Sequence, residues 1–150
     1  MEFKILPFND LSNNELYDLL KLRTDVFVVE QNCPYPELDQ KDKLAYHYIG
    51  LINNEIVATS RILPQHISYP ELSIGRVATQ INHRGKDLGK RMMHHILDFM
   101  DSEWNGVNIK ISAQSHLEKF YSEFGFEATG KKYLEDGIPH IEMLLMKVKS

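Results

Sequence analysis

The chain has 150 residues, 43% of them hydrophobic, and a formal net charge of −4, which fits one compact domain over residues 1–150 and argues against a nucleic-acid-binding protein. No apolar run is long enough for a membrane span, and the first residues lack the pattern of a signal peptide, so we expect a cytoplasmic protein without a membrane partner. The single cysteine, Cys33, excludes an internal disulfide and the usual spacings of zinc ligands.

The first third of the chain predicts an edge strand and a helix. Residues 3–6 favour a strand that a proline ends, and Ser12 or Asn13 can cap a helix whose apolar residues continue to Phe27. Two prolines in the segment 27–39 then predict an extended, rigid loop. This loop is either a wall of a substrate site or a structural crossing.

The middle of the chain predicts a β-hairpin and a third strand. Two alternating runs, 46–52 and 55–63, flank the pair Asn53-Asn54, which favours a tight turn between antiparallel strands. A further β-prone run covers residues 73–79. We expect the two hairpin strands to lie beside it.

After residue 79 a glycine-containing loop opens into a predicted helix. Apolar residues at positions 88, 92, 96 and 100 have helical spacing, and Gly85 and Gly89 allow a sharp turn and the close approach of a ligand. The unpaired N–H groups at a helix start attract anions. The stretch 76–91 also carries a local charge of +4, against −8 for the rest of the chain, from Arg76, Arg84, Lys86, Asp87, Lys90 and Arg91. We therefore predict a pyrophosphate site; the alternative is a basic helix start on a solvated surface.

The spacing within this loop narrows the type of phosphate site. It lacks the Lys-Ser/Thr of a Walker A loop and the Gly-x-Gly-x-x-Gly of a dinucleotide-binding fold. It resembles motif A of the GNAT acetyltransferases, Arg/Gln-x-x-Gly-x-Gly/Ala, in the form Arg84-x-x-Asp87-x-Gly89. Asp87 stands where the motif has its first glycine. Aspartate tolerates a left-handed backbone and can cap a helix, but its charge opposes a phosphate.

The last third of the chain predicts a second strand and helix. Residues 107–112 alternate as a half-buried strand, and Ser115 begins a helix that ends at Gly125. The end of this helix, Phe120-Tyr-Ser-Glu-Phe-Gly-Phe126, resembles motif B of the GNAT acetyltransferases, in which a tyrosine four residues before the glycine faces the coenzyme sulfur. Tyr121 holds that position; alternatively, it packs within an aromatic cluster.

Further segments across nearly the whole chain resemble the ElaA-like subfamily of GNAT proteins. The resemblance implies an α/β (α+β) protein with the GNAT fold, a mixed, twisted six- or seven-stranded sheet with helices on both faces. It also implies an N-acetyltransferase that uses acetyl-coenzyme A as co-substrate and a primary amine of a small molecule or peptide as acceptor, without a metal. The segments are Leu22-Arg-x-x-Val-Phe-Val-Val-Glu-Gln-Asn-Cys-Pro-Tyr35, Ile74-Gly-Arg-Val77, Ala113-Gln-x-His-Leu117 and Tyr133-x-Glu-Asp-Gly-Ile-Pro-His-Ile141.

The resemblance also assigns roles to individual residues. The amine attacks the thioester directly, and Tyr121 serves as the general acid, since a phenol with a pKa near 10 suits donation to a thiolate. Gln114 lines the same groove. Backbone groups of Val77, Ala78 and Thr79 bind the pantetheine and the acetyl carbonyl. The pyrophosphate lies on the loop formed by Arg84, Gly85, Lys86, Asp87, Leu88, Gly89 and Lys90.

The acceptor side is less defined by the sequence. Residues of a suitable type to remove the proton of the amine are Glu30, His47, His116, His140 and Glu142, and the residues expected near the substrate are Glu30, Gln31, His47, Arg61 and His140. His47 and Arg61 can each reach a ligand or lie on its rim. The adjacent pair His94-His95 cannot chelate one metal from a helix. A non-catalytic module that senses coenzyme A is the alternative function, and a homodimer is an open alternative for assembly.

Overall fold

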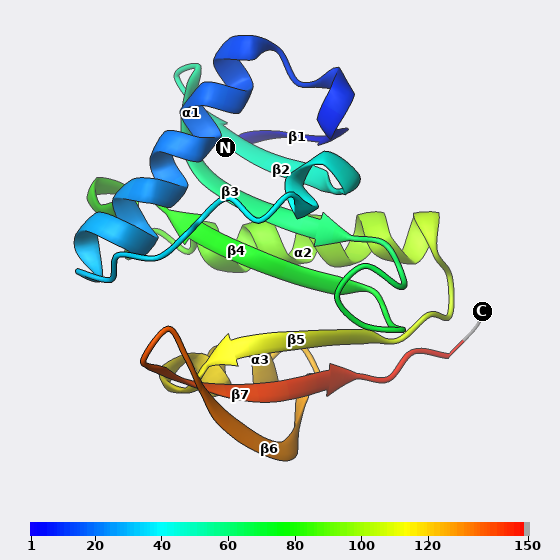
Figure 1. Cartoon of the computed structure of the whole chain (residues 1–150). Coiled ribbons are helices and arrows are strands. Elements are labelled where there is room, and N and C mark those ends of the chain that lie inside the picture. Colours follow the sequence, from blue (N-terminus) through cyan, green and yellow to red (C-terminus); the bar gives the residue numbers. More distant parts are fainter. Residues whose placement is uncertain (149–150) are drawn as a thin grey trace.

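The computed structural model describes residues 1–148, which contain seven strands in two sheets (Figure 1). The first sheet has the order β1-β2-β3-β4, with β1 Glu2–Pro7, β2 Tyr46–Ile52, β3 Glu55–Leu63 and β4 Ser73–Thr79. The second has the order β5-β7-β6, with β5 Ile109–Gln114, β6 Glu127–Glu135 and β7 Ile138–Leu145. All ladders within the sheets are antiparallel. One parallel bridge, Leu72 to Ile109, joins the two sheets. The expected mixed sheet is therefore confirmed, but it is divided into two parts between β4 and β5.

Two helices cover opposite faces of the four-stranded sheet (Figure 1). Helix α1, Asn13–Thr24, packs Leu19 and Leu22 on one face, in a cluster with Ile49, Ile56 and Ala78. Helix α2, Leu88–Glu103, packs on the other face, where its side chains join the larger core of Tyr48, Ala58, Met92, Met93 and Ile96. The expectation of helices on both faces is confirmed. No helix among residues 1–148 has the length and apolar character needed to cross a bilayer.

The start of α1 agrees with the prediction from the sequence, but its end does not. Ser12 caps the helix in a capping box with Glu15, through hydrogen bonds of 3.0 and 2.9 Å. The chain then continues through a π-helical segment, Asp25–Glu30, where an extended loop from Phe27 was expected. That expectation was wrong because Val26 still packs in the core beside α1 and holds the chain in helical form. The extended part begins only after Gln31, where the prolines disfavour a helix.

The predicted hairpin is confirmed. Asn53 and Asn54 both have left-handed backbones, with φ of 51° and 63°, as a tight turn of the primed type requires. Strand β3 pairs on its other edge with β4, so the hairpin lies beside residues 73–79 as expected.

The C-terminal part differs more from expectation. Strand β5 extends two residues beyond the predicted 107–112, and a 3-10 turn, Ser115–Leu117, precedes the short helix α3, Glu118–Ser122. Gly125, with φ of +95°, turns the chain out of the helix as predicted. The sequence patterns did not predict β6 and β7. Most side chains of β6 are exposed, so that strand has no alternating apolar pattern.

Candidate active site

The site lies where β4 separates from β5. In β4, Arg76 has a left-handed backbone with φ of 50°, and the register of β3 and β4 shifts beside it, which indicates a β-bulge. A bulge bends and twists a strand, so it contributes to the divergence of β4 from the second sheet. Two cavities open along this divergence, of about 490 Å³ and about 440 Å³. We call the one that contains the predicted pyrophosphate loop the coenzyme-side cavity and the other the acceptor-side cavity.

The coenzyme-side cavity collects almost all the residues expected to bind the coenzyme. Lys86 is the exception, since its side chain does not line the cavity. His116, one of the candidate bases, also lies on this side. The lining residues that the sequence predicted are Val77, Ala78, Thr79, Arg84, Gly85, Asp87, Leu88, Gly89, Lys90, Gln114 and Tyr121.

The loop before α2 has the backbone expected of an anion-binding turn. Gly85 has φ of +81°, and Asp87, at the N-cap position of α2, has φ of +58°. The left-handed conformation predicted for Asp87 is confirmed, but its side chain accepts no capping hydrogen bond. The first amides of α2 have no hydrogen-bond partner within the helix, and they lie at the positive end of the helix dipole. They can hold an anionic group in this cavity.

Arg84 links this loop to the π-helical segment. Its guanidinium donates two hydrogen bonds to the Glu30 carboxylate, at 2.7 and 2.8 Å, and others to the Thr79 carbonyl, at 3.0 and 3.3 Å. Glu30 therefore lies on the coenzyme side, and it does not line the acceptor-side cavity. This corrects the expectation of Glu30 beside the acceptor. The helical continuation to residue 30 directs its side chain toward the loop.

The boundary between the cavities consists of residues that line both. Among them, Gln31 and Gln114 exchange amide hydrogen bonds at 3.3 and 3.4 Å, which connects the segment after α1 to the end of β5. The residues shared by both cavities are Phe27, Gln31, Val77, Gln114, Leu117 and Tyr121.

Tyr121 packs in an aromatic cluster and also lies at the boundary between the two cavities. Its ring packs edge-on against Phe120 and Phe126, with centroid distances of 5.1 and 6.0 Å, and the residue is only 6% exposed. It also lines both cavities. Burial raises the pKa of Tyr121 to about 12, so its hydroxyl is protonated at neutral pH.

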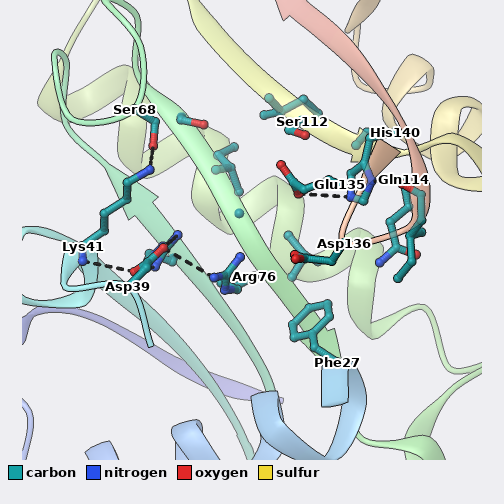
Figure 2. A pocket seen from close by; sticks show the side chains of 18 of the residues that line it. Phe27, Asp39, Lys41, Ser68, Arg76, Ser112, Gln114, Glu135, Asp136 and His140 are labelled. Atoms are coloured by element: carbon teal, nitrogen blue, oxygen red, sulfur yellow. Dashed lines mark hydrogen bonds and ion pairs between the residues drawn. The ribbon is translucent and has the colours of Figure 1, made fainter. Parts of the chain in front are cut away.

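The acceptor-side cavity lies between β3 and β4 on one side and β5, β7 and the β6–β7 turn on the other (Figure 2). His140 lies on β7. Its Nδ1 is 2.7 Å from the Ile138 carbonyl oxygen, and its Nε2 is 3.3 Å from a carboxylate oxygen of Glu135. An Nδ1–H that donates to the carbonyl leaves Nε2 as the atom that can accept a proton. Of the residues expected near the substrate, Gln31, Arg61 and His140 line this cavity.

His47 lies elsewhere, which corrects the expectation that it lies near a ligand. It is 1% exposed, and its Nε2 is 2.8 Å from the Asp42 carbonyl oxygen. Burial lowers its pKa, so the ring is neutral at physiological pH. Glu142, another candidate base, accepts a hydrogen bond from Thr129 and lines neither cavity. Glu142 lies on the same face of β7 as His140 but two residues farther along the strand, and His47 lies on β2, one strand farther from the split than β3.

A buried ion network supports the acceptor-side cavity, and the sequence patterns did not predict it. Arg23, which is 1% exposed, pairs with two acids at 3.0 and 2.8 Å. Arg61 and Arg76 complete the network through contacts between 2.7 and 3.4 Å. A signal was present in Arg23, a charged residue among the apolar side chains that α1 buries. The three carboxylates of the network belong to Glu37, Asp39 and Asp42.

The described residues 1–148 contain no group of three potential metal ligands. The features that mark the site are a polar loop at a helix start, a buried tyrosine and an ionisable pair, all placed along one split in the sheet.

Comparison with known proteins identifies the family. The model of the acetyltransferase (GNAT) domain matches residues 15–147, and the chain belongs to this family. Its members use an acyl-coenzyme A and an acceptor substrate. Protein ElaA of Escherichia coli K12 is 41% identical over 145 residues, which cover 95% of each chain.

Solved structures agree with this assignment. The crystal structure of E. coli ElaA has 39% sequence identity and a TM-score of 0.90, covering 97% of this chain and 99% of that one. An acyl-CoA N-acyltransferase from Pseudomonas aeruginosa has 38% identity and a TM-score of 0.91, covering 96% and 98%. An aminoglycoside 6'-N-acetyltransferase complexed with coenzyme A shares the fold, with a TM-score of 0.76 at 12% identity.

Proposed function

We propose that this protein transfers the acetyl group of acetyl-coenzyme A to a primary amine of a small molecule or peptide. The observation that carries the proposal is the position of Tyr121, which lines both cavities at their boundary. A coenzyme in one cavity and an amine in the other then meet beside a protonated phenol. Holding two reactants together in this way removes much of the entropic cost of the reaction.

The coenzyme-side cavity accounts for the binding of acetyl-coenzyme A. The amides of residues 85–90 receive the pyrophosphate, and the backbone of β4 at residues 77–79 receives the pantetheine and the acetyl carbonyl. Gly85 and Asp87 have left-handed backbones, and turns of this kind can present successive amides to an anion. The Arg84 guanidinium is then within reach of a phosphate as well as of Glu30.

In the reaction, the amine nitrogen attacks the acetyl carbonyl carbon and the bond between carbon and sulfur breaks. The departing thiolate takes a proton from the Tyr121 hydroxyl, and the proton that the nitrogen loses as the amide forms restores the Tyr121 phenol. Burial keeps that hydroxyl protonated at neutral pH, so its proton is available when the negative sulfur develops beside it. No covalent intermediate on the enzyme is required.

An ammonium acceptor must first lose a proton. His140 is the best placed of the candidate bases, because it lines the acceptor-side cavity and its Nδ1 faces a carbonyl oxygen, which leaves Nε2 to accept the proton. The Glu135 carboxylate, 3.3 Å from Nε2, stabilises the resulting imidazolium.

Thiol release tests the proposal. Purified protein is incubated with acetyl-coenzyme A and a panel of amino acids, polyamines, aminoglycosides and peptides with free N-termini. We expect at least one amine to cause release of free thiol together with an acetylated product. If calorimetry shows that coenzyme A binds but no amine causes release, the coenzyme-sensing alternative replaces the proposal.

A further inference from the structure

The acceptor-side cavity has two walls of unlike charge (Figure 2). In the ion network beside this cavity, three arginines pair with three carboxylates at distances of 2.7 to 3.4 Å, so the charges of the network cancel. Among the other lining residues, Lys41 lies on the wall formed by β3, β4 and the segment after α1. Glu135 and Asp136 lie on the opposite wall, at the β6–β7 turn. The cavity is therefore cationic at one end and anionic at the other.

The cationic end offers hydrogen-bond donors. Lys41 Nζ donates to Ser68 Oγ at 2.8 Å, and within residues 1–148 it forms no ion pair with a carboxylate. An ammonium group with a hydroxyl beside it suits a carboxylate ligand. A second cation placed there would meet the charge of Lys41.

The anionic end lies near the proposed chemistry. Figure 2 shows Glu135 and Asp136 directed into the cavity beside His140, with Gln114 on the same side. Gln114 belongs to the boundary with the coenzyme-side cavity. Two adjacent carboxylates attract an ammonium group, and His140 is placed to take its proton. The reacting amine therefore belongs at this end.

We infer that the acceptor is a small amino carboxylate, an amino acid or short peptide whose amine lies toward Glu135 and Asp136 and whose carboxylate lies toward Lys41. The inference deepens the proposed function and rests on it. The cavity volume of about 440 Å³ lies in the usual range of small-molecule sites, roughly 300–1,000 Å³. Binding of a linear polyamine is disfavoured, because its second cation would lie beside the charge of Lys41.

Three pentane-1,5-diamines that differ only in the substituent on one terminal carbon test the charge requirement. L-lysine carries a carboxylate, L-lysinamide replaces it by a neutral amide, and cadaverine lacks it. Calorimetric titration into protein saturated with coenzyme A should show that L-lysine binds about tenfold more tightly than the other two, as expected for a charge-assisted hydrogen bond. Equal or tighter binding of cadaverine, or no binding of L-lysine, would overturn the inference.

Variants of Lys41 test whether its charge causes the preference for L-lysine over L-lysinamide. Lys41→Gln should reduce the ratio of L-lysine to L-lysinamide affinity to about one, whereas Lys41→Arg keeps the charge and should keep most of the preference. Lys43→Gln is the matched control, because Lys43 is exposed and lines neither cavity. An unchanged ratio in Lys41→Gln would refute the assignment. If L-lysine binds as expected and no acetyl-coenzyme A is consumed, the amino-carboxylate binding site stands, whereas the proposed function and the role of the ligand as acceptor fail.

Discussion

Arg84 and Glu30 form a two-point ion pair, with N–O distances of 2.7 and 2.8 Å, that joins the loop before α2 to the π-helical segment after α1. Both residues line the coenzyme-side cavity. A carboxylate at this position competes with a phosphate for the same guanidinium. We therefore expect the pair to stabilise the loop and to oppose coenzyme binding.

Removing the charge of Glu30 should strengthen coenzyme binding. In Glu30→Gln, Arg84 is free to face the pyrophosphate, and a negative charge disappears from the cavity. Both groups of the pair are about one-third exposed, so we expect a modest gain, about two- to fivefold in Kd, since such pairs are worth about 0–1 kcal/mol. Calorimetry with coenzyme A measures it. Glu127→Gln, on the exposed strand β6, is the control and should leave Kd unchanged; weaker binding by Glu30→Gln would contradict the competition.

Asp87 should weaken coenzyme binding through its charge alone. Its carboxylate caps no helix amide, and its backbone is already left-handed, a conformation that glycine and asparagine also adopt. Asp87→Gly and Asp87→Asn should therefore both tighten coenzyme A binding, by about 1 kcal/mol at low salt, without lowering the melting temperature. Calorimetry at two salt concentrations and thermal unfolding test this. A clear loss of stability in Asp87→Asn would show that the carboxylate supports the fold.

Tyr121→Phe should separate catalysis from packing. The change keeps the ring contacts with Phe120 and Phe126 and removes only the hydroxyl. We expect kcat to fall about 100-fold or more, with nearly unchanged affinity for coenzyme A. Steady-state kinetics on an acceptor that supports turnover, together with calorimetry, measure both quantities.

Tyr48→Phe is the matched control for this experiment. Tyr48 is fully buried and its hydroxyl is 2.8 Å from His95 Nδ1, but it lines neither cavity. It should lose stability and keep its turnover per folded molecule. Parent-like turnover by Tyr121→Phe would remove Tyr121 from the reaction.

The raised pKa of Tyr121 predicts a loss of stability in alkaline solution. The unfolded chain loses this proton near pH 10, whereas the folded chain keeps it until about pH 12. The contribution of the protonated Tyr121 to the free energy of unfolding is thus fully present below about pH 10 and is lost as the pH rises toward 12. Between about pH 9 and 11 the parent should lose about 1 kcal/mol more than Tyr121→Phe in urea unfolding. Parallel pH dependences would show that the hydroxyl is not buried in this way.

The sequence by itself determined the local features of this protein. The capping box at Ser12, the Asn53-Asn54 turn and the left-handed turns around Gly85 depend on residues that are neighbours in the chain. Short-range sterics and hydrogen bonds decide such features, so a residue pattern reveals them. The glycine-containing loop and the position of Tyr121 in the sequence also indicate the family.

Only the tertiary structure decided which side chains share a cavity. Glu30 lies on the coenzyme side because the helix continues through a π-helical segment, and His47 is buried on β2 against the segment that carries Asp42. Arg23 meets its two acids 14 and 19 residues later in the chain, across a loop whose path no local pattern specifies. Lys41, in the 3-10 turn Lys41–Leu44, and Glu135, at the end of β6, line one cavity although they are far apart in the chain. Long-range packing sets these relationships, since it selects among local conformations that differ little in free energy.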